Sequence, residues 1–146
     1  MYSLIYLSIA PKALDQDELA EILRQSRPSN KAHDLTGCLA YIEGIIEYEQ
    51  QCRFIQVLEG PELAVLNVFE KIQSDNRHTE VTLIHKGPIE SRNFGLWEMG
   101  FEKISFSSGS PLKEFFQIDP QLLSEYGDIN DNMLLEFMKS FYQHLK

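Results

Sequence analysis

The chain has 146 residues, of which 43% are hydrophobic and 11% aromatic, and its formal net charge is −9. This length fits one domain with a single core. The negative charge argues against nucleic acid or an anionic membrane as partner, because both attract basic surfaces. It is also a simple aid to solubility. No stretch reaches the ~20 apolar residues that a membrane span needs. The apolar run Met1 to Ala10 has no basic segment before it and no cleavage site, so we expect a cytoplasmic protein.

Cysteine and histidine are sparse and show no metal-binding spacing. Cys38 and Cys52 both fall in predicted strands, where buried free thiols are the default interpretation. The four histidines form no HxxxH or Cys/His cluster; they are His33, His78, His85 and His144. We therefore expect no metal site in this protein.

The first half of the chain predicts a strand, a helix and two further strands. Tyr2 to Ile9 is rich in β-formers and almost uncharged, as is typical of a central strand. Asp15 and Glu18 form a capping box at the start of the helix, which should end before Pro28. The two following strands are predicted at Leu35 to Ile42 and Arg53 to Glu59.

A second helix and two more strands complete a recognisable order. Gly60-Pro61 opens a helix whose apolar residues recur with helical spacing. Strands are predicted at Glu80 to Lys86 and Phe94 to Phe101. The order βαββαββ indicates a ferredoxin-like α+β fold, with a mixed five-stranded sheet. The right-handed crossover rule places both helices on one face.

The C-terminal segment is predicted to cover the other face of that sheet. Asp131 to Leu145 carries apolar residues at helical spacing, and a shorter helix is expected within Pro111 to Tyr126. We expect residues 1–101 to form the main domain and residues 102–146 a helical cap of the same compact unit. Such an apolar stripe also suits a partner protein.

Gln56 is the residue that simple core packing explains least. It lies within the apolar run Phe54 to Leu58, where an unpaired amide costs about 1–3 kcal/mol. One interpretation is an amide paired with neighbouring backbone, just as Tyr6 is explicable as a core tyrosine. The other uses the amide's two unlike ends, a donor and an acceptor. Reversing a buried amide exchanges what each neighbour receives, which makes a two-state switch.

Several motifs stand in a fixed order along residues 1 to 101. They are Ile5-Tyr6-Leu7-Ser8, Asn30 with Leu35-Thr36-Gly37, Phe54-Ile55-Gln56-Val57-Leu58-Glu59-Gly60, Asp75-Asn76-Arg77-His78 and the run from Arg92 to Met99. Each is weak alone, but the ordered series resembles the BLUF family, sensors of blue light using FAD. The resemblance implies FAD held between the two helices, with its ring toward the sheet.

The resemblance also assigns roles to particular residues. Light is expected to drive electron and proton transfer from Tyr6 to the flavin, after which Gln56 changes its hydrogen bonding. Asn30 is expected to fix the edge of the flavin ring. Trp97 and Met99 match strand positions that relay the signal. The cofactor FAD rests on the resemblance alone, since FMN or riboflavin would also fill a ring pocket.

Further cofactor contacts are expected along both helices. Ile22 and Ile72 would sandwich the ring, although ordinary core packing explains them nearly as well. Lys71, Asp75 and His78 match positions near the ribityl chain or phosphates, and a solvated helix end is the alternative. The sequence has no G-x-G-x-x-G motif, so a Rossmann loop is excluded.

The run Glu43 to Cys52 is longer than the connection that is usual in the family. We expect an extended β-hairpin that protrudes past the sheet, and a docking arm is the alternative. The hairpin also contains Gln50 and Gln51. Only Gln56 precedes Val-Leu-Glu-Gly, so neither of the other two is assigned the flavin role.

Three classes of function remain to be separated. The first is a photosensor that is not an enzyme, acts on a downstream signalling protein and self-associates into a homo-oligomer. The second is a flavin-dependent enzyme, which predicts turnover with a reductant. The third is a flavin-free enzyme or interaction module on the same scaffold, which predicts a colourless protein.

Overall fold

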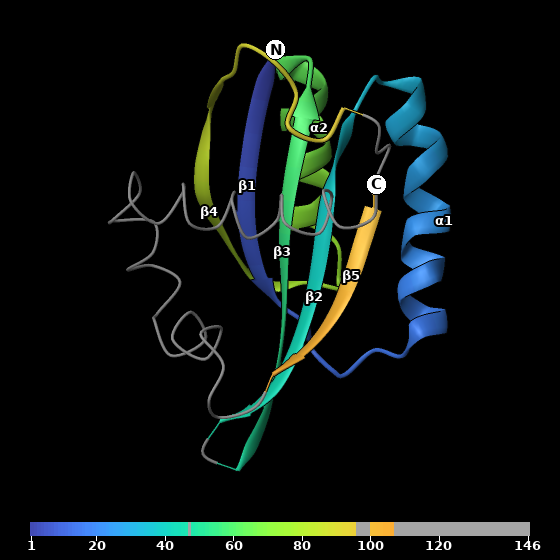
Figure 1. Cartoon of the computed structure of the whole chain (residues 1–146), viewed down its shortest axis with the longest axis vertical. Coiled ribbons are helices and arrows are strands. Elements are labelled where there is room, and N and C mark those ends of the chain that lie inside the picture. The colour runs from blue at the N-terminus through green and yellow to red at the C-terminus, as the bar shows by residue number, and fades with distance from the viewer. Residues whose placement is uncertain (47, 96–99, 107–146) are drawn as a thin grey trace.

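The computed structural model describes residues 1–46, 48–95 and 100–106. The elements in chain order are β1 (Tyr2–Ile9), α1 (Gln16–Ala32), β2 (Thr36–Ile46), β3 (Glu49–Gly60), α2 (Glu62–Gln73), β4 (Thr79–Pro88) and β5 (Gly100–Phe106). Across the sheet they stand in the order β4-β1-β3-β2-β5 (Figure 1). β3 pairs antiparallel with β1 and β2, β4 pairs antiparallel with β1, and β5 runs parallel to β2.

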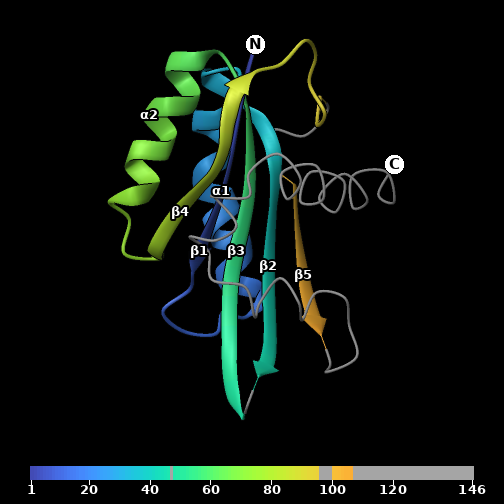
Figure 2. The same ribbon diagram turned by 90° about the vertical axis from the view of Figure 1, so that its left-hand side faces the viewer.

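The predicted α+β class is confirmed, with four antiparallel strands and two helices. Both helices pack on one face of the sheet (Figures 1 and 2). The core on this face joins Leu19 and Leu23 of α1 with Val65 and Phe69 of α2. Alternate residues of the strands complete it, among them Leu4, Tyr6, Leu39, Phe54 and Leu58. The helical cap predicted for residues 102–146 starts too early, because residues 102–106 belong to β5 and pair with β2. The rest of the predicted cap lies outside the described residues.

Helix α1 begins as predicted and ends later than predicted. The carboxylate of Asp15 accepts a hydrogen bond from the Glu18 amide at 2.8 Å, and the Glu18 side chain accepts one from the Asp15 amide at 3.1 Å. The prediction that the helix ends before Pro28 is wrong, because it continues to Ala32. Its buried stripe of Leu19 and Leu23 is continued by Asn30, and this burial outweighs the backbone bond that proline removes.

The last predicted strand is misplaced. Phe94 and Gly95 lie in a bend and a turn, whereas β5 starts at Gly100 and runs to Phe106. The physical reason lies in Glu59, whose carboxylate accepts hydrogen bonds from the amides of Asn93 and Phe94. These backbone donors are therefore used outside any strand ladder.

The predicted long hairpin is confirmed. β2 and β3 pair continuously from Thr36↔Glu59 to Ile46↔Glu49. β1 accompanies β3 only as far as the pair Ile9↔Arg53, so the tip of the hairpin extends beyond β1 (Figure 1). Tyr48 at this tip is fully exposed and has a left-handed φ of 70°.

Candidate functional site

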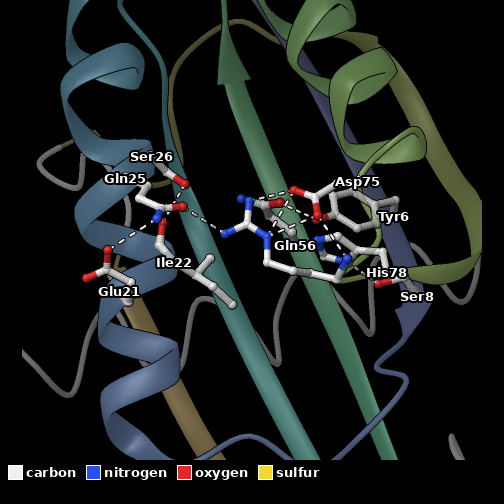
Figure 3. A network of polar contacts seen from close by, with 10 residues as sticks. Tyr6, Ser8, Glu21, Ile22, Gln25, Ser26, Gln56, Asp75 and His78 are labelled. Carbon is white, nitrogen blue, oxygen red and sulfur yellow. Dashed lines mark hydrogen bonds and ion pairs between the residues drawn. The ribbon is translucent and has the colours of Figure 1, made fainter.

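Tyr6 and Gln56 lie side by side on the two central strands. They are direct partners in the register of β1 and β3, and the hydroxyl of Tyr6 donates a hydrogen bond to Oε1 of Gln56 (Figure 3). Tyr6 is 1% exposed and Gln56 8%. The Gln56 amide is therefore paired with a side chain, rather than only with neighbouring backbone. This pair forms the floor of the site.

A cavity of about 70 Å³ lies above this floor, between α1 and α2. It is lined by seven of the residues expected to hold the cofactor, namely Tyr6, Ile22, Asn30, Gln56, Ile72, Asp75 and His78. Ile22 and Asn30 come from α1 and Ile72 from α2, whereas Asp75 and His78 follow α2 in the chain. The topology thus brings together residues that are spread over most of the domain.

Lys71 lies apart from this cavity. It lines a larger groove of about 480 Å³ on the outer side of the two helices. The other polar residues of that groove are Ser29, His33, Asn67, Glu70 and Ser74. Val68 borders both the groove and the inner cavity, so the two spaces are neighbours. Lys71 is thus placed for a group outside the inner cavity.

Trp97 and Met99, the two expected relay residues, lie outside the described part of the chain. The described chain stops before them at Gly95 and resumes at Gly100. Their position relative to Tyr6 and Gln56 stays a prediction.

Burial controls the ionisation of Tyr6. Desolvation raises the pKa of its phenol far above the ordinary value, and the nearby negative charge of Asp75 raises it further. Arg77 opposes both effects. The hydroxyl therefore stays protonated at neutral pH and remains the donor in its hydrogen bond to Gln56.

Arg77 is a cavity residue that the sequence analysis missed. Its guanidinium pairs with the carboxylate of Asp75, and its Nη1 donates to Oε1 of Gln25 on α1 at 3.3 Å. The hydrogen bonds from Arg77 hold the pKa of Asp75 below its usual range. The D-x-R-H motif contained this residue. Its acid, Asp75, and its imidazole, His78, were each assigned a role, but the cation between them was not.

His78 is held against both Tyr6 and Phe54. Its ring centroid lies 5.9 Å from that of Tyr6 and 4.8 Å from that of Phe54. Nδ1 lies 2.7 Å from the hydroxyl of Ser8, a buried residue on the same face of β1 as Tyr6 (Figure 3). Burial lowers the pKa of His78 to about 4, so the imidazole is neutral at physiological pH.

These features have a clear counterpart among known proteins. The family model described as "Sensors of blue-light using FAD" (BLUF) matches residues 1–100. The chain belongs to the BLUF family. The match confirms the predicted resemblance and the association of the domain with blue light and flavin.

Individual relatives agree with this assignment. The photoactivated adenylate cyclase subunit beta of Euglena gracilis is 34% identical over 90 residues, which are 62% of this chain and 10% of that protein. The dark-state structure of the BLUF protein BlrB is 28% identical, with a TM-score of 0.67 and 95% of both chains covered. The ground state of BlsA gives a TM-score of 0.68 at 25% identity, over 94% of this chain and 87% of that one.

The BLUF domain is a sensor module, as expected, and not an enzyme. The matched residues make up only a tenth of the cyclase subunit, so the likeness does not extend to the rest of that protein. Neither described helix has the length and apolar character of a transmembrane segment. Within the described part of the chain, no group of three or more His, Cys, Asp or Glu side chains is arranged to hold a metal ion.

The lining of the cavity suits the chemistry of a flavin ring. Gln56 and Asn30 are buried amides, which pair well with ring carbonyls and nitrogens, and Arg77 adds a cation. Ile22, Val68 and Ile72 supply apolar surface for the ring faces. At about 70 Å³ the cavity is small beside the roughly 300–1,000 Å³ of typical ligand pockets.

Proposed function

We propose that this chain is a blue-light receptor that binds FAD non-covalently between α1 and α2. The observation that carries the proposal is the buried hydrogen bond from Tyr6 to Gln56 at the floor of a cavity lined by amides and a cation. Asn30 and Arg77 would hold the polar edge of the ring, and Ile22 and Ile72 its two faces. Asp75 and His78 would lie toward the ribityl chain, and Lys71 in the outer groove suits the phosphates.

The bound flavin supplies absorption of blue light and an acceptor for an electron and a proton. Tyr6 gives up both, so Gln56 loses the donor that it has in the ground state. The amide then reverses by rotation or tautomer change, and it presents its other end to the cofactor. This changed hydrogen bond would shift the absorption to the red, and the return of both the electron and the proton to Tyr6 would restore the dark form.

The signal then has to leave the domain. BLUF relatives include a photoactivated adenylate cyclase subunit, in which the matched part is 10% of the protein. For this chain we propose a relay through Trp97 and Met99 to the segment that follows β5, residues 107–146, which we expect to form helices that cover the second face of a five-stranded sheet. A separate cytoplasmic signalling protein would receive the signal from a homo-oligomer of this chain.

An absorbance spectrum before and after blue light tests the proposal. A yellow protein whose flavin band moves to the red and then decays back supports it. A yellow protein with no shift, but steady turnover with a reductant, favours a flavin enzyme. A colourless protein that takes up no added flavin contradicts the proposal. Chromatography of the released cofactor separates FAD from FMN and riboflavin.

A further inference from the structure

The carboxylate of Glu59 binds one short segment of chain. Glu59 lies on β3, three residues after Gln56, and is 0% exposed. Its Oε1 accepts hydrogen bonds from the amides of Asn93 at 2.9 Å and Phe94 at 2.8 Å. Its Oε2 accepts from the amide of Asn93 at 3.0 Å and from Asn93 Nδ2 at 2.8 Å. A buried carboxylate is thereby supplied with donors from two adjacent residues.

Arg92, the preceding residue, ties the same segment to the start of β2. Its guanidinium donates to Thr36 Oγ1 at 2.8 Å, to the Asp34 carbonyl at 2.8 Å and to the Glu59 carbonyl at 3.2 Å. It also forms an ion pair with the Asp34 carboxylate at 2.9 Å. Charge-assisted bonds of this kind fix geometry as well as adding energy. Residues 92–94 are thus attached to two strands at once.

Gly60 makes this attachment sterically possible. A Cβ at position 60 would lie 2.8 Å from the Asp34 carbonyl oxygen and 2.7 Å from Cδ2 of Leu35. The carbonyl of Asp34 is one of the acceptors of Arg92. The absence of a side chain at Gly60 therefore lets the end of β3 approach the backbone that Arg92 also holds. Glu59 and Gly60 thus act together: the carboxylate binds Asn93 and Phe94, and the glycine lets the end of β3 approach the Asp34 backbone.

The attached segment leads directly, in sequence, to Trp97 and Met99. We infer that Glu59 is a positioning residue, which fixes the chain entering the Trp97–Met99 segment to the strand that carries Gln56. A change of hydrogen bonding at Gln56 then displaces β3, and Glu59 passes this displacement to residues 92–94. The inference rests on the proposed function, because it concerns how the light signal leaves the same site.

The test uses Glu59→Gln in the full-length protein with bound FAD. Glutamine keeps the size of the side chain. Its amide has one acceptor oxygen and one NH2 donor, so it cannot accept hydrogen bonds at both positions as the carboxylate does. Hydrogen exchange in the dark should speed up at the amides of Asn93 and Phe94 by at least about tenfold, the factor expected when a hydrogen bond to a charged group is lost. Glu90→Gln is the matched control, since Glu90 is exposed and lies in the same connection.

The second measurement follows Trp97, which is the single tryptophan of the chain. With fluorotryptophan incorporated, the fluorine NMR signal reports on position 97 alone. We expect Glu59→Gln to keep the red shift of the flavin, while the light-minus-dark change of the fluorine signal falls several-fold. Glu90→Gln should keep both. Asn93→Ala removes only the side-chain donor, so it should give a smaller loss and serves if Glu59→Gln does not fold.

The outcomes separate this inference from the proposed function. Faster exchange at Asn93 and Phe94 with an unchanged Trp97 response would overturn the positioning role. So would an altered red shift in Glu59→Gln, because Glu59 would then act on the flavin itself. A wild-type protein that binds flavin but shows no red shift would overturn the proposed function and the relay together. In that case, the exchange rates would still show whether Glu59 holds residues 92–94.

Discussion

Gln56 and Glu59 lie three residues apart on β3, yet their side chains point to opposite faces of the sheet and make different kinds of hydrogen bond. Gln56 faces the helices and accepts from the neutral hydroxyl of Tyr6, through an amide that can present either end. Glu59 presents only acceptors, and its donors are the backbone amides of Asn93 and Phe94 together with the side-chain amide of Asn93. Backbone donors cannot reverse. One strand thus combines a hydrogen bond that can be exchanged with others that hold the chain in place.

Removal of the exchangeable amide should have the largest effect. Gln56→Leu should retain flavin and lose the red shift completely, because leucine has no end to present to the cofactor. A light-minus-dark absorbance spectrum measures this. Gln50→Leu, on the exposed part of the same strand, is the control and should shift normally. A full red shift in Gln56→Leu would remove glutamine from its proposed role.

Tyr6→Phe tests the partner of the amide. We expect bound flavin and no normal signalling state, because the phenol proposed to supply the electron and proton is gone. The variant should also be less stable by about 1–2 kcal/mol, since Oε1 of Gln56 loses a buried donor. Urea unfolding and the absorbance spectrum measure the two effects. Tyr48→Phe, at the exposed tip of the hairpin, should change neither.

Loss of the Glu59 carboxylate should reduce stability without loss of the red shift. Glu59→Gln should lower the free energy of unfolding by roughly 3 kcal/mol, because charge-assisted bonds to a buried carboxylate are lost. Glu90→Gln should stay within about 0.5 kcal/mol of the wild type. Urea denaturation at neutral pH measures both. Equal free energies of unfolding for the two variants would show that the hydrogen bonds of the Glu59 carboxylate do not stabilise the fold.

A smaller effect concerns the charge of His78 beside Tyr6. Its pKa of about 4 in the folded protein lies below the ordinary 6.5. Between those values the unfolded chain binds a proton that the folded chain does not, so stability falls as the pH is lowered through this window. The loss is about 2 kcal/mol, allowing for the partial exposure of the ring. The pKa of Asp75 is lowered as well, so that carboxylate adds its own loss only below about pH 3.8.

Urea unfolding at pH 7 and pH 4.5 tests this effect. His78→Gln should remove most of the difference between the two pH values. His85→Gln, at an exposed position on β4, should keep it. An unchanged pH dependence in His78→Gln would mean that other groups cause the loss.

The sequence predicted the parts of the fold that follow local rules. The capping box of α1 and the long hairpin both depend on residues close in sequence. The end of α1 was missed because its buried stripe continues through Asn30, a polar residue that an apolar pattern does not register.

The errors elsewhere have a common cause in long-range contacts. Phe94 has strong β propensity, but its amide binds Glu59, which lies 35 residues earlier in the chain. Arg77 was overlooked because a charged residue near a helix end usually faces solvent, whereas here Asp75 and Gln25 hold it at the cavity. No local pattern contains either contact, so only the folded chain reveals them.

Gly60 has a consequence for engineering. An alanine scan would be expected to flag this position as damaging, although glycine contributes no side-chain contact, because the added methyl group meets the backbone of Asp34. Direct contacts therefore join the loop before β2, the end of β3 and the start of the connection to β5. A chain break in any of these three segments should destabilise the domain. A fusion that grafts this light sensor onto a new effector should therefore leave these three segments intact.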